Sequence, residues 1–105
     1  MNALKHGERS RAAQAALERL ATLLDLDGPP GRIEGYDLSH LHGSDPVAGM
    51  SVLLGGVADT AAYRHFALRE APGGDDYAGL REVLRRRFAA GEDLGPRPDL
   101  LLIDG

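Results

Sequence analysis

The sequence contains no cysteine, which excludes a disulfide scaffold, a thiolate metal site and a cysteine nucleophile. It also lacks any apolar run close to the roughly 20 residues of a membrane span. The N-terminus has no apolar core of the kind found in signal peptides. From these absences we expect a cytoplasmic protein, and its 105 residues fit one domain of ordinary size.

Lysine is almost absent, so arginine carries the positive charge. Eleven of the twelve basic residues are Arg, and sixteen acidic residues give a net charge of −4. An acidic chain gains no overall attraction to phosphate, although Arg suits bidentate contact with phosphate or carboxylate better than Lys does. A GC-rich coding bias would also raise the Arg content, so charge leaves the class of partner open.

Apolar spacing predicts a long N-terminal helix over residues 1–27. Apolar residues recur three or four positions apart and form one stripe. The stripe contains Ala13, Leu17, Leu20 and Leu24. The Gly-Pro-Pro run that follows ends the helix, because Pro cannot continue it. We therefore divide the chain into an N-terminal helix with a Pro/Gly linker, residues 1–30, and a domain over residues 31–105.

Three strand-like runs follow the linker, over residues 32–38, 47–54 and 62–69. The first and third alternate with the period of two that strands show, and the second is mostly apolar. A turn at residues 42–46 and a Gly-Gly pair separate the runs. Consecutive strands joined by short turns indicate an antiparallel meander, in which we expect His65 to be half-buried.

A helix and a fourth strand complete the pattern. The helix is predicted over residues 77–90, with Asp75 or Asp76 as its N-cap and with its arginines mostly outside its buried stripe. That stripe contains Leu80, Val83, Leu84 and Phe88. The unbroken apolar run at residues 99–104 is typical of a strand that is buried on both faces, parallel to its partner and reached by a helical crossover.

The predicted fold class is therefore α/β. Its mixed sheet combines a three-strand antiparallel meander with one parallel strand reached through a helix, and an N-terminal helix precedes it. Because a following helix normally covers such a last strand, we expect the chain to be part of a longer protein.

Three carboxylates occupy positions that suit metal chemistry. Asp37 lies inside the first strand between apolar neighbours, Asp104 ends the last strand, and Asp76 begins the second helix. If the first and last strands are adjacent, Asp37 and Asp104 face each other across about 5 Å of sheet, where Mg²⁺ or Mn²⁺ would relieve their repulsion. Hydrogen-bonded structure, a helix cap and a turn would explain the same residues without a metal.

Several segments of the sequence carry a family resemblance, among them Val47-Ala48 and Tyr63-Arg64-x-Phe66. Residues 32–40 read RIEGYDLSH, residues 75–78 read DDYA and residues 98–105 read PDLLLIDG. Together with residues 81–88, they resemble, in order and in spacing, motifs of the UvrC family of the excinuclease ABC system. The first segment matches the family pattern R-I-E-x-[FY]-D-[IL]-S-[HN]. The resemblance extends from about residue 30 to the last residue of the sequence.

The resemblance implies an RNase H-like nuclease domain that makes the 5′ incision in bacterial nucleotide excision repair by metal-dependent hydrolysis of DNA. The family's catalytic carboxylates fall on Asp37, Asp76 and Asp104, and Asp37 and Asp104 are the implied ligands of Mg²⁺ or Mn²⁺. The implied partners are damaged double-stranded DNA and UvrB, with UvrA acting earlier in the pathway.

Arginines are the candidates for contact with nucleic acid. They are Arg64, Arg81, Arg85 and Arg86. In the family the last motif continues into Gly-x-Gly-Gln and a catalytic His lies further downstream, so we expect this chain alone to cut DNA weakly or not at all. Two alternatives stay open. One is a non-catalytic RNase H-like module that binds DNA or a repair partner, and the other is a generic α/β domain whose acidic residues form caps and turns.

Overall fold

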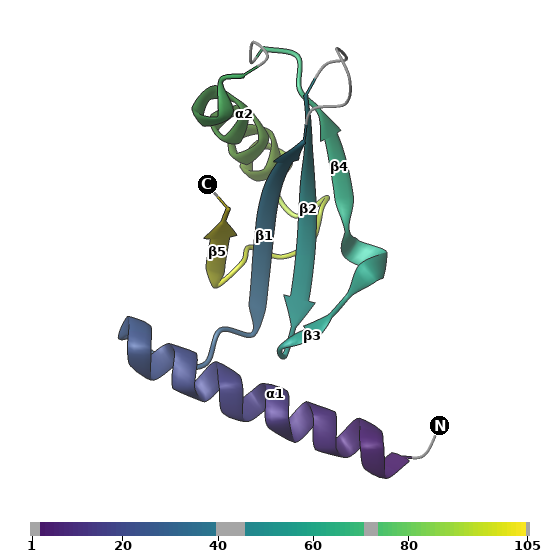
Figure 1. Cartoon of the computed structure of the whole chain (residues 1–105), viewed down its shortest axis with the longest axis vertical. Helices are drawn as coiled ribbons and strands as arrows, with labels where there is room; N and C mark the ends of the chain where they lie inside the picture. Colours follow the sequence, from purple (N-terminus) through teal and green to yellow (C-terminus); the bar gives the residue numbers. More distant parts are fainter. Residues whose placement is uncertain (1–2, 40–45, 71–73, 105) are drawn as a thin grey trace.

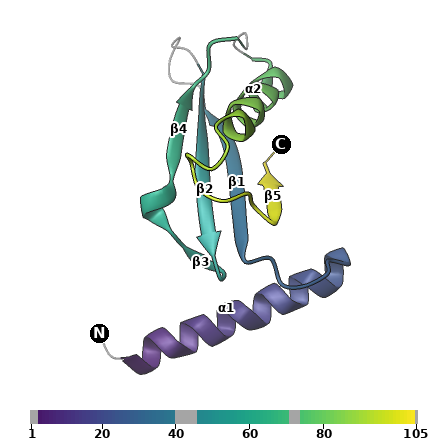
Figure 2. The ribbon, with the colours of Figure 1, turned by 180° about the vertical axis from the view of Figure 1, so that it is seen from behind.

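The computed structural model describes residues 3–39, 46–70 and 74–104. Its elements, in chain order, are α1 (Ala3–Leu24), β1 (Arg32–Ser39), β2 (Val47–Leu54), β3 (Val57–Ala58), the 3₁₀ turn η1 (Thr60–Ala62), β4 (Arg64–Ala67), α2 (Asp76–Ala89) and β5 (Leu100–Ile103). The described strands form one sheet. Across one face of it lies α2, and α1 lies beyond the end at which β1 begins (Figures 1 and 2). Among the described residues, no helix is long and apolar enough to cross a membrane.

The sheet is mixed, as the sequence predicts. Its strand order is β3-β2-β1-β5, and β4 also pairs with β2. The strands β1 and β2 are antiparallel and pair over their whole lengths. In contrast, β5 runs parallel to β1, with Leu100 beside Ile33 and Ile103 beside Tyr36, and the chain reaches it through α2. The meander, the parallel strand and the helical crossover confirm the predicted fold class.

The third strand differs from its prediction. Within the predicted range 62–69, all of which the structure describes, only β4 forms, and a further short strand, β3, lies before that range; the two pair with opposite ends of β2. The turn η1 separates them and closes through a hydrogen bond from Tyr63 N to Thr60 O (3.2 Å). This turn interrupts the pairing with β2, which an alternating sequence pattern does not reveal. The predicted turn at residues 42–46 lies almost wholly outside the described residues.

The N-terminal helix is shorter than predicted and is only partly packed. It ends at Leu24 rather than at residue 27, because Asp25 adopts a positive φ of 56°. Leu17 is buried as the predicted stripe requires, but Leu24 is 48% exposed. The packed part of α1 meets the turn between β2 and β3, where a Cβ added at Gly56 would lie 2.9 Å from Ala13 Cβ.

The second helix has the predicted N-cap, but the burial of the side chains in its last turn differs from the prediction. The side chain of Asp75 caps it by accepting a hydrogen bond from the Ala78 amide (3.0 Å). Val83 is buried as expected, but Phe88 is 37% exposed and the fully buried residue beside it is Arg87. The prediction that places Phe88 in the core and the arginines outside it is therefore wrong at these two positions.

The core lies between the sheet and α2. Its buried residues are Tyr36, Ala48, Met50, Val52, Phe66, Leu68 and Val83. A close approach at Gly79 brings the helix onto the sheet, since a Cβ there would lie 3.0 Å from Leu38 Cδ1 and 3.1 Å from Leu68 Cδ1. On β5 the prediction of burial on both faces is wrong: Leu102 and Ile103 are 49% and 44% exposed, because β5 pairs only with β1 among the described strands.

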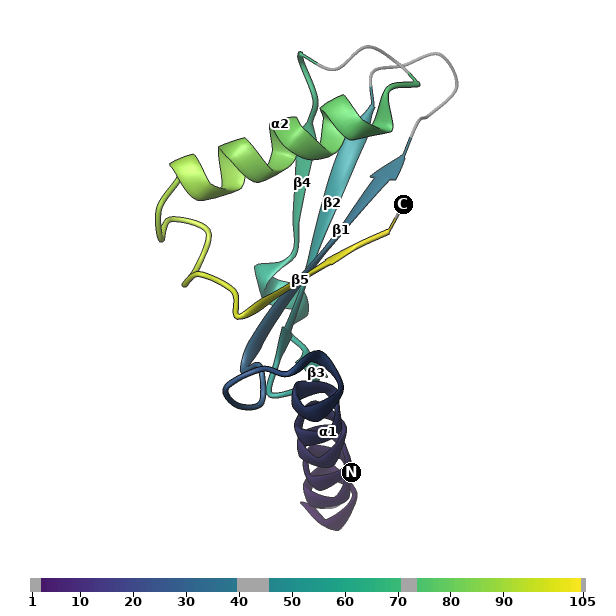
Figure 3. The same cartoon turned by 90° about the vertical axis from the view of Figure 1, so that its left-hand side faces the viewer.

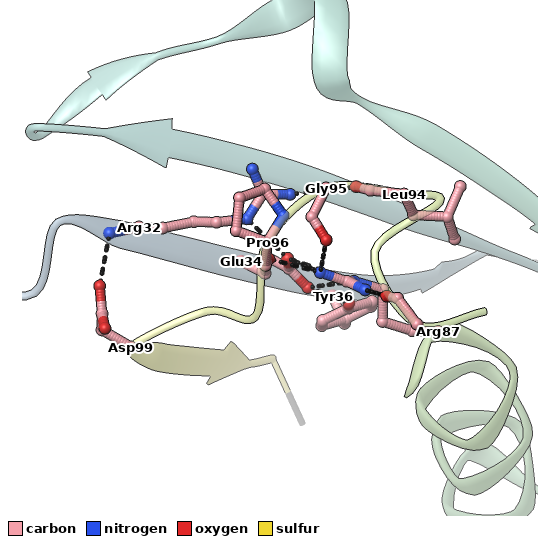
Figure 4. A network of polar contacts seen from close by, with 9 residues as sticks. Arg32, Glu34, Tyr36, Arg87, Leu94, Gly95, Pro96 and Asp99 are labelled. Carbon is pink, nitrogen blue, oxygen red and sulfur yellow. Dashed lines mark hydrogen bonds and ion pairs between the residues drawn. The ribbon is translucent and has the colours of Figure 1, made fainter. Parts of the chain in front are cut away.

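A buried carboxylate, Glu34, joins β1 to α2 (Figure 4). Glu34 and Arg87 are both fully buried, and Arg87 donates to the carboxylate through Nε (2.9 Å) and Nη2 (2.8 Å). Arg32 Nε (2.9 Å) and the Tyr36 hydroxyl (2.6 Å) donate to the same carboxylate. These donors compensate a charge whose burial would otherwise be strongly unfavourable.

The same guanidinium groups hold the segment between α2 and β5. Arg87 Nη2 donates to the carbonyl oxygens of Gly95 (3.2 Å) and Pro96 (2.7 Å), and Arg32 Nη2 donates to that of Leu94 (3.2 Å). Gly95 has a φ of +110°, and a Cβ there would lie 2.7 Å from Arg32 Nη2, so only glycine suits this position. The network thus connects β1, α2 and the approach to β5.

The contacts in the network also decide its charge states. Burial raises the pKa of the Glu34 carboxyl, but the hydrogen bonds from its three donors outweigh burial and hold that pKa below its ordinary value. Burial, followed by the hydrogen bond to Glu34, raises the pKa of Tyr36. The hydrogen bond to Glu34 raises the pKa of Arg87. At neutral pH, Glu34 and Arg87 are therefore a charged pair.

Removing the buried charge of Glu34 tests what the network contributes to stability. Glu34→Gln is expected to lower the free energy of unfolding by about 3–5 kcal/mol, because it leaves a buried guanidinium without its counter-ion. The matched control is Glu70→Gln, which breaks the exposed ion pair of Glu70 with Arg85 and is expected to cost less than about 1 kcal/mol. Urea unfolding of both variants gives the comparison, and equal losses would contradict the assignment.

Acid titration provides a second test of the same pair. Because the pKa of Glu34 is lower in the folded chain than its ordinary value of 4.5, its stabilising contribution is complete above about pH 4.5 and is lost as the pH falls through the folded pKa. We expect urea midpoints of the unaltered chain to fall more steeply below that pH than those of Glu34→Gln. Parallel pH profiles for the two proteins would contradict this.

Candidate functional site

The face of the sheet turned away from α2 carries a hollow of about 580 Å³. Figure 3 shows the sheet nearly edge-on, with α2 over one face only. Residues of β1, β2 and β4, together with the C-terminal end of β5, line the hollow, and several of the lining residues are small: Gly35, Gly49 and Ser51. Because successive side chains of a strand point to opposite faces, this face is the reverse of the one that packs on α2.

Asp37 and Asp104 lie on neighbouring strands at this hollow. Their strands, β1 and β5, are parallel, and Tyr36 pairs with Ile103. The amide of Asp104 donates to Tyr36 O (3.4 Å), which continues the ladder by one residue. Asp37 and Asp104 are both exposed and both line the hollow. The structure thus brings two of the three predicted carboxylates to one place.

Two features hold Asp37 in this orientation. At the start of β5, Arg32 N donates to Asp99 Oδ2 (2.9 Å) and Asp99 N donates to Arg32 O (2.8 Å), which aligns β5 with β1. Further along β1, Glu34 and Tyr36 are anchored in the buried network. A shift of one residue would turn Asp37 into the core and Glu34 out of it. The alternation of the strand therefore couples the buried network to the exposed carboxylate.

Asp76, the third predicted carboxylate, does not line the hollow. It is the first residue of α2, which begins near the end of the sheet toward which β1 runs (Figure 3). Within the described residues, no group of three or more His, Asp or Glu side chains is arranged to hold a metal ion. The carboxylates that the hollow itself provides as hard oxygen ligands for a metal ion are therefore those of Asp37 and Asp104.

The candidate arginines do not gather at one site. Arg64 lines the hollow, and its Nη1 donates to the carbonyl oxygens of Ala61 (3.0 Å) and Tyr63 (2.8 Å). The other three lie on α2, over the opposite face: Arg81 stacks on Tyr77, Arg85 pairs with Glu70, and Arg86 binds Ala67 O and Glu82. Of the four candidate arginines, only Arg64 therefore contributes to the lining of the hollow.

The sequence analysis did not identify the roles of residues on either face of the sheet, the open face at the hollow or the face that packs on α2. The prediction of a half-buried His65 is wrong, since His65 is exposed and lines the hollow. The sequence pattern did not single out Glu34 and Arg87, although both occupy core positions, Glu34 on the same face of its strand as Tyr36 and Arg87 four residues after Val83. A charged residue at a core position on each of two elements is a recognisable signal of a buried ion pair.

The chain resembles known proteins over nearly its whole length. Residues 21–105 match the family described as UvrC RNAse H endonuclease domain. The UvrABC system protein C of Syntrophotalea carbinolica is 46% identical over 101 residues, which cover 96% of this chain and 16% of that protein. The protein of the same name from Synechococcus sp. (strain JA-3-3Ab) is 48% identical over 87% of this chain and 15% of its own length.

A third relative agrees with these two. The UvrABC system protein C of Desulforapulum autotrophicum is 41% identical over 109 residues, which cover 100% of this chain and 18% of that protein. The chain thus spans less than a fifth of the length of the curated relatives that it matches. The match of the family over residues 21–105 and the identities above 40% show that this chain belongs to the UvrC family, in the part that forms its RNase H endonuclease domain.

Proposed function

We propose that this chain provides the metal-dependent endonuclease site that makes the 5′ incision on the damaged DNA strand in bacterial nucleotide excision repair. The observation that carries the proposal is the placement of Asp37 and Asp104 on adjacent parallel strands at one open hollow. The names of its relatives, UvrABC system protein C, support the same assignment. Because the chain spans a small part of those relatives, the incision is proposed for the protein that contains this domain.

The donor set at the hollow fits a divalent metal ion. Two neighbouring carboxylates repel each other unless a cation or a proton lies between them, and carboxylate oxygens are the ligands that Mg²⁺ and Mn²⁺ prefer. Asp37 and Asp104 would hold the ion, and Asp76 is the third proposed catalytic carboxylate through its match to the family motif. Bound there, the ion would supply positive charge to the phosphoryl oxygens and lower the pKa of a coordinated water.

The remaining groups at the hollow act on the substrate. Gly49 carries no side chain, and a Cβ added there would meet only Asp37 O at 3.9 Å, so a DNA backbone can approach the sheet closely at this point. Arg64 also contributes to the lining of the hollow, and a guanidinium is suited to bidentate contact with a phosphate. The proposed substrate is damaged double-stranded DNA, and the proposed partners are UvrB and, earlier in the pathway, UvrA.

One observation favours a second candidate function. Asp76 does not line the hollow, and no third carboxylate joins Asp37 and Asp104 within the described residues. A site with two carboxylates suits a non-catalytic RNase H-like module that binds DNA or a repair partner. The two functions differ in whether a metal ion binds at Asp37 and in whether incision depends on it.

Calorimetry with Mn²⁺ tests the carboxylate pair directly. The unaltered chain is expected to bind Mn²⁺ saturably, and Asp37→Asn and Asp104→Asn are each expected to weaken binding at least about tenfold, because each removes a charged ligand. The control is Asp93→Asn, which removes one exposed carboxylate from the turn after α2. No binding by the folded chain, or equal binding by all four proteins, would contradict the metal site.

An incision assay tests the activity in a protein of full length. Residues 21–105 would replace the matching segment of the Syntrophotalea carbinolica relative, and the hybrid would be assayed on lesion-bearing duplex DNA with UvrA and UvrB. Asp37→Asn is expected to lower the rate of 5′ incision by about 10²-fold or more, whereas Asp93→Asn leaves it unchanged. Incision that survives Asp37→Asn would favour the non-catalytic module.

A further inference from the structure

His65 lies in the same row across the sheet as the carboxylate pair. Asp37 on β1 pairs with Gly49 on β2, and Gly49 pairs in turn with His65 on β4. Directly paired residues of antiparallel strands point to the same face, so Asp37 and His65 share the open face. On the other side of β1, Asp104 extends this row by one strand. The row therefore reads Asp104, Asp37, Gly49, His65 across four strands.

Gly49 leaves the middle of this row open. Neighbouring strands lie about 4.8 Å apart, so the backbones at Asp37 and His65 are separated by about 10 Å. A Cβ added at Gly49 would come no closer to another residue than 3.9 Å, to Asp37 O, so the position faces open space. Asp37, Gly49 and His65 all line the hollow. The row thus has room for a group of phosphate size between the imidazole and the carboxylates.

The two ends of the row differ in charge. Asp104 and Asp37 form an acidic end, and His65 of β4 lies at the opposite end of the row. Tyr63 and Arg64 of the same segment also contribute to the lining of the hollow. An imidazole N–H can donate a hydrogen bond to a phosphate oxygen. A phosphodiester lying across Gly49 would therefore turn one side toward the carboxylates and the other toward a donor.

We propose that His65 is a phosphate-contacting residue, which binds a phosphate of the DNA strand that crosses the hollow over Gly49. This inference rests on the proposed function, because it takes DNA as the ligand of the hollow. It goes beyond that function by assigning a role to a residue that lies outside the carboxylate set and outside the candidate arginines. It also fixes the path of the strand, which runs over β2 between β1 and β4.

The test measures binding of a short fluorescein-labelled single-stranded DNA to the chain by fluorescence anisotropy. The measurement is made near pH 6 over a series of salt concentrations. His65→Gln is expected to raise Kd about tenfold, as expected for one lost charge-assisted hydrogen bond. It should also reduce the slope of log Kd against log salt by about 0.7, the value for one phosphate contact on a single strand. His65→Arg is expected to restore both quantities.

A matched control separates this contact from a general effect of charge. Arg19→Gln removes one positive charge from an exposed position of α1, beyond the far end of the sheet, and is expected to change neither Kd nor the slope. Because His65 is itself exposed, its variants should unfold in urea as the unaltered chain does. An equal loss in Arg19→Gln, an unchanged His65→Gln, or no DNA binding by the unaltered chain would overturn the proposal.

Mn²⁺ calorimetry distinguishes failure of this proposal from failure of the proposed function. His65→Gln is expected to bind Mn²⁺ as the unaltered chain does, because the imidazole lies across Gly49 from the carboxylates. A chain that binds Mn²⁺ through Asp37 but binds DNA equally well without His65 retains the proposed function and loses this inference. If the chain binds no Mn²⁺ but His65→Gln weakens DNA binding, the phosphate contact of His65 is retained and the proposed metal-dependent function is lost.

Discussion

Glu34 places a charged carboxylate with no exposed surface in a strand of the sheet, and the rest of the chain is arranged to meet that charge. Its main partner, Arg87, comes from α2, so the helix can dock only where the guanidinium reaches the carboxylate. The remaining donors of Arg87 are taken up by carbonyl oxygens after the helix, which sets the route of the chain into β5. One buried ion pair therefore positions the crossover helix and the parallel strand together, and its geometry is more specific than apolar packing alone.

The two faces of β1 have different roles: one belongs to the buried polar network, and the other carries the exposed carboxylate of the candidate site. On the inner face, Glu34 and Tyr36 belong to a network in which, among the described residues, no buried polar side-chain atom lacks a partner. On the outer face, Asp37 lies at an open hollow floored by glycine and serine. A ligand carboxylate is held precisely when its own strand cannot slip or twist, and the inner network supplies that constraint from nearby positions of the same strand. Stability and the proposed chemistry are thus carried by opposite faces of β1.

Much of this arrangement follows from the sequence. Period-two alternation and short turns predict the meander, and an apolar run after a helix predicts the parallel strand, which together place Asp37 beside Asp104. The buried pair was missed because both residues are charged, although Arg87 continues the spacing of Val83 along the buried stripe and Glu34 shares a strand face with Tyr36. The alternation of β4 puts His65 on the face opposite Phe66 and Leu68, but it does not reveal that this face is left uncovered by the described residues, so the exposure of His65 could not be predicted.

The pairing of β1 with β5 also has a kinetic consequence. Contacts at the start of that pair join residues 67 positions apart in the chain, so the chain must close a long loop before the contacts form, and such pairing is slow compared with the local meander. A nascent or partly folded chain that has formed β1, β2 and β4 presents Asp37 and His65 without Asp104. The two carboxylates of the proposed metal site therefore come together only when β5 pairs with β1, and a molecule that lacks this pairing does not hold Asp37 beside Asp104.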